Sequence, residues 1–286
     1  MKISIGSFAY LHSEQREEGI QRMKRHGYTA MDYQRFFHPD EPLYDAGDAE
    51  FEEAVLADKA AIEAAGIEIF QIHGPWRYPP QDGEEADRQE WFGKMCRAIH
   101  GAALLGAKYF VVHPLMPFGI WKDQEPHQEE LIRINVDFFR RLCDVAEKEG
   151  VVICLENMPF TYFPISTPED ILALVKEINH PAMRVCLDTG HCVVKGVELG
   201  DAVRLFGKEY LRVLHVHDND GRNDQHRFPF YGKGDWDGFA AALKEIGYEG
   251  TLSLECRVSD RVPAEIREHH EIGLFMLARE LAKKCE

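Results

Sequence analysis

The chain has 286 residues, of which 45% are hydrophobic and 29% are charged, a composition that is typical of soluble globular proteins with a sizeable core. The net charge of −16 disfavours nucleic-acid binding, because a strongly acidic surface repels the phosphate backbone. No stretch reaches the roughly 20 apolar residues of a membrane span. The seven cysteines are scattered without a Cys-x-x-Cys pair, which predicts a reducing, cytoplasmic location without disulfides.

The opening segment, MKISIGSFAY, is predicted to be a strand and not a signal peptide, because its short apolar run alternates with polar residues. Seven further segments repeat a pattern of helix, glycine, apolar strand and polar strand end. In chain order they cover residues 24–33, 63–74, 104–114, 147–157, 180–191, 207–220 and 247–257. The strands are near-continuous apolar runs, as is expected of parallel strands that are covered on both faces.

Helical patterns lie between these strands. The sequence STPED places Thr167 as an N-cap, Pro168 at the first helical position and Asp170 where a capping-box acid belongs. A helix over residues 130–148 is predicted from an apolar face at helical spacing, which consists of Leu131, Ile134, Phe138, Leu142 and Val145. Similar patterns predict helices over residues 51–65, 86–105, 236–246 and 264–283.

Eight strands that alternate with helices predict an α/β fold, a single (β/α)8 TIM-barrel domain over residues 1–286. A doubly wound open sheet is the alternative. No linker or shift of composition divides the chain. In a barrel of this kind, the side chains at the C-terminal ends of the strands meet at one mouth, and the chemistry takes place there.

Six consecutive predicted strands end in side chains that can bind a metal. These are His73, His113, Glu156 with Asn157, Asp188 with His191, His215 with His217 and Asp218, and Glu255. A single polar strand end is usually a satisfied residue at a loop entrance. Six polar strand ends that converge on one mouth predict a bound metal ion, because the crowded acidic side chains would repel one another without a cation between them. Carboxylates and imidazoles suit zinc, manganese or iron. Asp224 and His226 follow on the loop after the seventh strand, where a solvated polar loop would explain them equally well.

With these residues assembled, the whole chain resembles the superfamily that unites xylose-isomerase-like sugar isomerases and epimerases with endonuclease IV. The most specific stretches are LEN at 155–157, LDTGH at 187–191, HVHDND at 215–220 and LSLE at 252–255. In the ketose 3-epimerase branch, one divalent ion is held by Glu, Asp, His and Glu on the last four strands. The matching residues are Glu156, Asp188, His215 and Glu255. His217 lies two residues after His215, so its side chain points to the same face of the strand. It remains a substitute ligand or a residue just outside the ligand shell.

The endonuclease IV branch uses three zinc ions, and its additional ligands correspond to His73, His113, His191, Asp224 and His226. The ligand set therefore does not choose between the branches, but the loops at the strand ends favour a sugar enzyme. They contain no basic run that would neutralise several phosphates. They do contain many aromatic rings, which suit the apolar faces of a sugar: Tyr33, Phe36, Phe37, Trp76, Trp121, Phe160, Tyr162, Phe228, Phe230 and Tyr231.

The resemblance implies a metal-dependent isomerase or epimerase of a sugar, sugar phosphate or keto-sugar, with zinc or manganese and one to three ions. Glu156 and Glu255 are expected to be ligands and also to transfer the proton through an enediolate. The expected substrate contacts are His191, His217, Trp76, Arg222 and Arg257. The alternatives are an endonuclease IV-like AP endonuclease, and a keto-sugar lyase or partner subunit on the same scaffold. The expected partner is a small carbohydrate, with no nucleic acid and no membrane, and homo-oligomerisation is left open.

Overall fold

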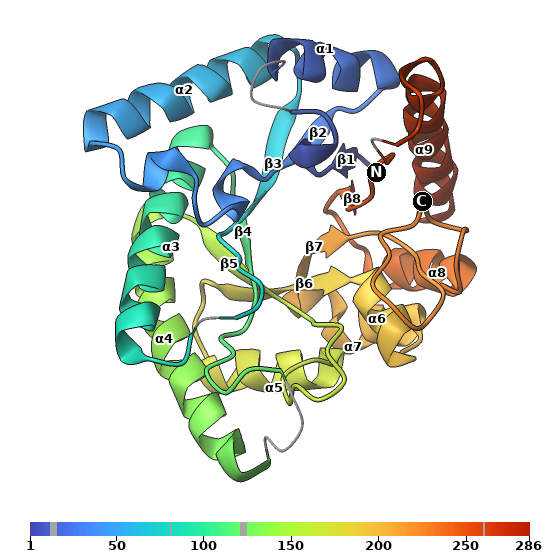
Figure 1. The fold of residues 1–286 in the computed structure, drawn as a ribbon. Coiled ribbons are helices and arrows are strands. Elements are labelled where there is room, and N and C mark those ends of the chain that lie inside the picture. Colours follow the sequence, from blue (N-terminus) through green and yellow to red (C-terminus); the bar gives the residue numbers. More distant parts are fainter. Residues whose placement is uncertain (12–15, 81, 121–124, 260) are drawn as a thin grey trace.

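The computed structural model describes residues 1–11, 16–80, 82–120, 125–259 and 261–286. Within these ranges, eight strands alternate with helices around a common axis (Figure 1). The strands are β1 (Ile3–Ile5), β2 (Ala30–Tyr33), β3 (Glu68–His73), β4 (Tyr109–Val112), β5 (Val152–Glu156), β6 (Met183–Asp188), β7 (Leu211–His215) and β8 (Leu252–Leu254). Each lies in a segment that the sequence pattern predicts to contain a strand.

The strands form a closed ring. Strands β2 to β7 pair in parallel in chain order, and β1 pairs in parallel with β8. Single parallel bridges join these two groups, one between Gly6 and Asp32 and the other between Val216 and Leu254. The predicted (β/α)8 barrel is confirmed, and the open sheet is excluded.

The helices surround this ring on the outside. They are α1 (Arg16–His26), α2 (Asp48–Ala64), α3 (Glu85–Leu105), α4 (Gln128–Glu149), α5 (Pro168–Ile178), α6 (Thr189–Lys195), α7 (Leu199–Tyr210), α8 (Trp236–Ile246) and α9 (Ala264–Lys284). Short 3-10 turns are η1 (Ser7–Ala9), η2 (Arg35–Phe37), η3 (Pro42–Tyr44) and η4 (Glu125–His127). The predicted capping box starts α5, because Thr167 and Asp170 each accept a hydrogen bond from the other's backbone N–H. Helices α1, α6 and α7 are additional to those predicted.

A buried apolar layer fills the barrel below the polar strand ends. It consists of Val111, Cys154, Cys186 and Val213, which are all fully buried. Each stands two residues before a polar strand end: His113, Glu156, Asp188 and His215. Because side chains alternate along a strand, those four polar side chains also point into the barrel, one layer nearer its mouth.

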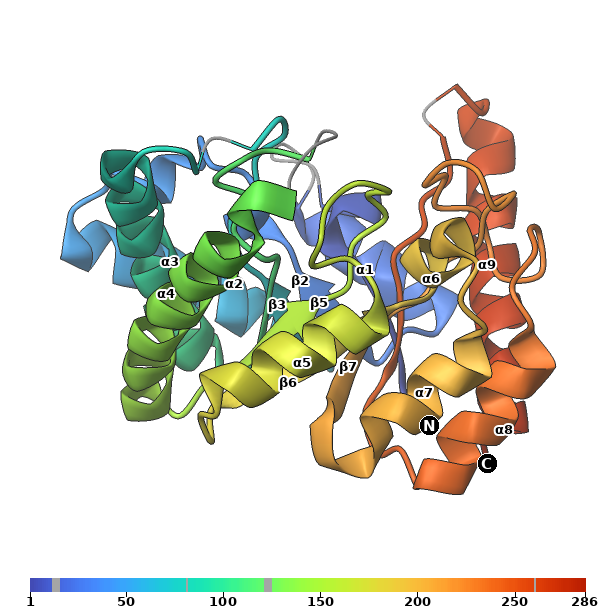
Figure 2. The same cartoon turned by 90° about the horizontal axis from the view of Figure 1, so that it is seen from below.

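The two ends of the barrel differ. Viewed from the side, long loops gather at one end of the barrel and the two chain termini lie at the other (Figure 2). The loops include those that follow β3, β4 and β5, so they surround the C-terminal ends of the strands. Among the helices of the described ranges, none is long and apolar enough to cross a membrane.

Candidate metal and active site

The polar strand ends gather into adjoining groups at the mouth of the barrel. In each group, one potential ligand atom per residue lies within 4.8 Å of the others. Three of these groups are His73 with His113 and Glu156, Asp188 with His191 and His217, and His217 with Asp224 and His226. His217 belongs to the last two groups, so they form one continuous cluster.

Glu156 is the centre of the first group and is only 1% exposed. Its Oε2 atom lies 3.2 Å from Nε2 of His113 and 3.7 Å from Nε2 of His73. Its Oε1 atom lies 3.0 Å from Nδ1 of His215. Burial by itself would raise the pKa of Glu156, but the positive charges of His215 and His113 outweigh burial and hold this pKa well below the usual 4.5. The buried carboxylate is therefore ionised and able to bind a cation.

Asp188 ends β6 and also caps α6, a short helix that sequence analysis did not predict. Its Oδ1 atom accepts a hydrogen bond from the backbone N–H of His191 at 2.6 Å. Its Oδ2 atom lies 2.9 Å from Nε2 of His217. Gly190 makes room for this contact, since a Cβ atom there would lie 1.9 Å from Cε1 of His217. The LDTGH sequence thus positions Asp188 directly against His217.

The two histidines at the end of β7 have different surroundings. His215 lies between carboxylates on both sides, with Nε2 3.1 Å from Oδ2 of Asp32 and Nδ1 3.0 Å from Oε1 of Glu156. His217 presents Nε2 to Oδ2 of Asp188 and, at 3.9 Å, to Oε2 of Glu255. The family resemblance gave the ligand position to His215, and Nδ1 of His215 also lies 3.6 Å from Oε2 of Glu255. Each histidine thus faces two of the other expected ligands. They differ in that Nδ1 of His217 has no hydrogen-bond partner among the described residues, whereas both nitrogens of His215 lie within hydrogen-bond distance of a carboxylate.

Asp224 joins His226 of the third group to His191 of the second. Its Oδ2 atom lies 3.3 Å from Nε2 of His191 and 3.1 Å from Nε2 of His226. Burial lowers the pKa of both histidines, but the nearby carboxylates outweigh it. Asp188 and Asp224 raise the pKa of His191 to about 10, and Asp224 and Glu255 raise that of His226 to about 10. In the metal-free protein, both histidines are consequently protonated at neutral pH.

Two cavities open beside these groups. The histidine cavity has a volume of about 280 Å³ and is lined by His73, Phe37, Trp76, Tyr78, His113, Glu156, Met158, Pro159, Phe160, His191, Asp224, His226 and Glu255. The glutamine cavity has a volume of about 390 Å³ and is lined by Gly6, Phe8, Ala9, Gln34, Phe37, Gln225, His226, Glu255, Cys256 and Arg257. Phe37, His226 and Glu255 line both, so the cavities are neighbours that share one wall.

The expected substrate contacts divide into two sets. Trp76 and His191 line the histidine cavity, and Arg257 lines the glutamine cavity. The ring of Trp76 stands perpendicular to that of His113 at 4.3 Å. In contrast, His217 is fully buried and Arg222 is exposed, and neither lines either cavity.

The aromatic residues expected at the mouth also divide. Phe37 and Phe160 line the histidine cavity, whereas Tyr33 and Phe36 belong to the buried core. Trp121 lies outside the described residues. The other expected aromatics line neither cavity: Tyr162, Phe228, Phe230 and Tyr231.

Sequence analysis missed three polar or aromatic residues from the first two strands and the loops that follow them. Asp32 is 1% exposed and contacts His215, while Gln34 and Phe8 line the glutamine cavity. Asp32 carried a signal, because it stands in the apolar strand sequence AMDY and is costly to bury without a partner. Gln34 and Phe8 carried none, since glutamine and phenylalanine are common in loops.

The donor set fits a divalent cation. It combines carboxylates with imidazoles, the ligands that zinc and manganese accept. Oε2 of Glu156 and Nδ1 of His217 are buried and have no hydrogen-bond partner within the described part of the chain. Buried polar atoms are rarely left in this state, so a cation that binds these groups accounts for both the crowding and the missing partners.

The fold and this site define a TIM-barrel protein with a candidate metal centre at the C-terminal mouth of the barrel. Residues 20–276 match the family described as "Xylose isomerase-like TIM barrel", and the chain belongs to this family.

Similar proteins include sugar enzymes and a nuclease. An inosose isomerase from Bacillus subtilis is 30% identical over 157 residues, which cover 53% of this chain and 54% of the relative. A probable endonuclease 4 from Mycoplasmoides gallisepticum is 26% identical over 198 residues, 65% of this chain and 59% of the relative. The chain thus spans little more than half the length of these curated relatives. The crystal structure of a D-tagatose 3-epimerase-like protein superposes with a TM-score of 0.78 at 22% identity, covering 100% of this chain and 98% of that one, which shows the shared fold.

Proposed function

We propose that this protein is a divalent-metal-dependent isomerase or epimerase of a sugar or keto-sugar that acts by proton transfer. One observation carries the proposal: Glu156 and Glu255 reach the same point from opposite parts of the barrel. Oxygens of Glu156 and Glu255 lie 3.0 Å and 3.6 Å from Nδ1 of His215, and both side chains line the histidine cavity. Two carboxylates at one cavity suit the removal and return of a proton. The similarity to an inosose isomerase supports the same reaction class.

The residues proposed to hold the ion are Glu156, Asp188, His217 and Glu255. When bound, a divalent ion polarises carbonyl and hydroxyl oxygens of the substrate and stabilises negative charge on them. Zinc or manganese suits these ligands. Two further positions for ions are proposed, so the number of ions is one to three. One lies at His73, His113 and Glu156, and the other lies at Asp224, which contacts both His191 and His226.

The chain's own carboxylates would carry out the proton transfer. One glutamate takes the proton from the carbon between the carbonyl and its neighbouring hydroxyl, and the bonding electron pair moves to the carbonyl oxygen as an enediolate forms. The other glutamate returns a proton to the opposite face of that carbon in an epimerisation, or to the adjacent carbon in an isomerisation. Burial raises the pKa of Glu255, whereas the pKa of Glu156 is low, and such a separation suits a donor and an acceptor.

The experiment is hydrogen exchange in deuterated water with a panel of ketoses and keto-sugars. Metal-loaded protein should place deuterium beside the substrate carbonyl, and Glu156→Gln and Glu255→Gln should each abolish this. Metal content must be measured in both variants, because both residues are also proposed ligands. Glu177→Gln, a change of an exposed glutamate on α5, is the matched control and should exchange as the unchanged protein does. A metal-loaded protein that exchanges no member of the panel would contradict the proposal.

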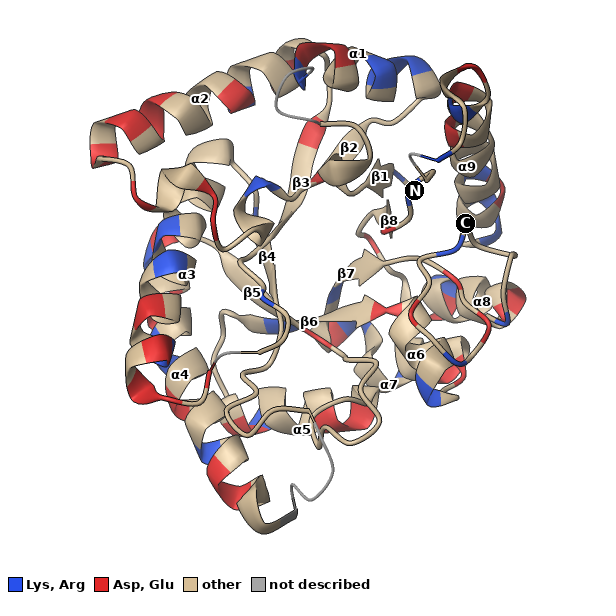
Figure 3. Cartoon of the chain, viewed as in Figure 1, with Lys and Arg blue, Asp and Glu red and all other residues tan. Residues whose placement is uncertain are grey.

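A zinc-dependent AP endonuclease is the second candidate, because the structure brings together all nine residues that correspond to endonuclease IV ligands, His215 or its alternative His217 included. The surroundings favour the sugar enzyme. Lys and Arg residues lie mainly on the outer helices, mixed with Asp and Glu (Figure 3). Of the residues that line the two cavities, Arg257 is the one Lys or Arg. A duplex backbone requires several such contacts.

All seven cysteines are free, which supports the proposed cytoplasmic location.

A further inference from the structure

The candidate active site has two arms that meet at Glu255. The histidine cavity and the glutamine cavity share Glu255, His226 and Phe37. The ring of Phe37 forms part of the wall between them, since it stands edge-on to His73 at 4.8 Å and edge-on to Phe8 at 5.5 Å. A substrate that reacts at Glu255 can therefore extend from the reacting carbon into both arms.

The glutamine cavity holds a hydrogen-bond donor that points to a ligand. Gln34 is only 4% exposed. Its Oε1 atom accepts a hydrogen bond from the backbone N–H of Phe8 at 3.2 Å, which fixes the amide. Its Nε2 atom has no hydrogen-bond partner in the ranges that the structure describes, and the side chain lines the cavity. This amide donor is reached from the cavity and is available to a ligand or to water.

Gly6 preserves the position of this amide. A Cβ atom at Gly6 would lie 2.5 Å from Oε1 and 2.9 Å from Nε2 of Gln34. Any larger residue in this place would therefore displace the amide from the cavity. The backbone at Gly6, directly after β1, thus sets the position of the Gln34 amide at the cavity.

The lining of the glutamine cavity suits an uncharged sugar ring. Phe8 and Phe37 offer apolar surface to the C–H faces of a ring. The amides of Gln34 and Gln225 can bond with hydroxyl groups, because an amide both donates and accepts. Phosphate would require a cluster of cations or a helix N-terminus. Arg257 is the one Lys or Arg in this lining, and Glu255, an acidic residue, lines the same cavity.

Resting on the proposed function, we propose that the substrate is a two-unit carbohydrate, a keto-sugar joined by a glycosidic bond to a second, uncharged sugar ring. The reacting unit occupies the histidine cavity, and the second ring occupies the glutamine cavity against Phe8 and Gln34. Small-ligand sites have volumes of roughly 300 Å³ and above. The histidine cavity, at about 280 Å³, approaches this size and the glutamine cavity, at about 390 Å³, exceeds it, so each arm has room for its own unit.

The test compares matched one-unit and two-unit substrates on metal-loaded protein, with deuterium exchange and product formation as readouts. The pairs are fructose against lactulose and isomaltulose, and methyl 3-keto-glucoside against 3-keto-maltose. We expect kcat/KM for a two-unit member to exceed that of its one-unit partner by about tenfold or more, which is the contribution of a hydrogen bond and an aromatic contact.

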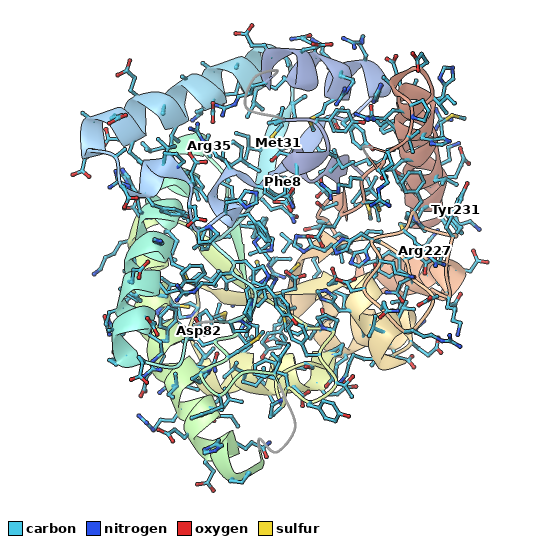
Figure 4. The ribbon with its side chains drawn as sticks, in the orientation of Figure 1. Phe8, Met31, Arg35, Asp82, Arg227 and Tyr231 are labelled. Atoms are coloured by element: carbon cyan, nitrogen blue, oxygen red, sulfur yellow. The ribbon has the colours of Figure 1, made fainter. Side chains whose placement is uncertain are left out.

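Two variants probe the second arm. Gln34→Glu keeps the acceptor for the N–H of Phe8 but removes the amide donor, and Phe8→Ala removes an aromatic wall. Both should reduce the two-unit preference, mainly by raising KM for the two-unit substrate. Tyr231→Ala is the matched aromatic control, because Tyr231 is 65% exposed and lies at the outer edge of the molecule, whereas Phe8 lies near its centre (Figure 4). This control should leave the preference unchanged.

The outcomes separate the two proposals. Equal kcat/KM for one-unit and two-unit substrates, unchanged in ratio by Gln34→Glu and Phe8→Ala, overturns the two-unit inference and leaves the isomerase proposal standing. Absence of exchange with every member of the panel, in protein shown to contain its metal, overturns both.

Discussion

The clearest test of the site is to exchange its two neighbouring histidines one at a time. His217→Gln and His215→Gln are matched changes, since both side chains are fully buried and project from the same strand end. Glutamine in each place keeps a polar group of similar length. Both side chains approach Glu255, but both nitrogens of His215 are engaged by Asp32 and Glu156, whereas Nδ1 of His217 has no hydrogen-bond partner among the described residues and Nε2 of His217 faces Asp188. We therefore expect His217→Gln to lose the metal and His215→Gln to bind it more weakly.

The expected sizes differ enough to be measured. Binding of structural zinc by four ligands is worth roughly 10–16 kcal/mol, so one ligand contributes about 2.5–4 kcal/mol. This predicts a loss of about 10²- to 10³-fold in metal affinity for His217→Gln. A residue that only orients a ligand typically contributes about 10- to 100-fold to metal affinity. We expect a loss of this size for His215→Gln, because His215 contacts the proposed ligand Glu156.

The assay is metal content per chain after dialysis against chelators of increasing strength, with circular dichroism to show that each variant is folded. If His215→Gln releases the ion while His217→Gln retains it, the assignment of the ligand to His217 is wrong. Equal losses in both variants would show that the distances to Asp188 and Glu255 do not identify the ligand.

Two further predictions concern pH and nucleic acid. In the metal-free protein, the pKa values of His191 and His226, about 10, lie above the 6.5 of an unfolded histidine. Their ion pairs therefore stabilise the fold fully below pH 6.5 and lose this effect as pH rises towards 10. The Tm of the metal-free protein should fall as pH rises over this window, and it should fall less in His226→Gln. An equal fall in the unchanged protein and in the variant would refute the ion pairing of His226. Zinc-loaded protein should neither bind duplex DNA at physiological salt nor incise an abasic site, because its acidic surface repels phosphate. Incision that disappears in Glu156→Gln would instead establish the nuclease.

The barrel and the location of the site could be predicted from the sequence, because both depend on local patterns. Apolar runs marked the strands, most of them preceded by a glycine, and the polar residues that end the runs were visible as breaks in the pattern. Glu156 and Asp188 are examples, since each stands two residues after a buried cysteine on the same strand face. The capping box at Thr167 was equally local, because all its atoms lie within four residues.

Only the tertiary structure decided which of these residues meet. His215 and His217 share a strand face, so alternation alone cannot rank them. Their different contacts depend on distant residues such as Gly190, which leaves room for His217 beside Asp188. Helix α6 after Asp188 was also missed, since its seven residues are too short for a periodic pattern.

The second arm of the site depends still more on distant parts of the chain. Phe8, Gln34 and Arg257 lie on loops that are far apart in sequence, and closure of the barrel between β1 and β8 brings them together. Arg222, an expected substrate contact, is exposed and lines neither cavity. The sequence determined which side chains face the mouth of the barrel, because alternation along a strand is a local property. The packing of distant strands and loops decided their partners, because the space beside each side chain is set by residues that no local pattern identifies.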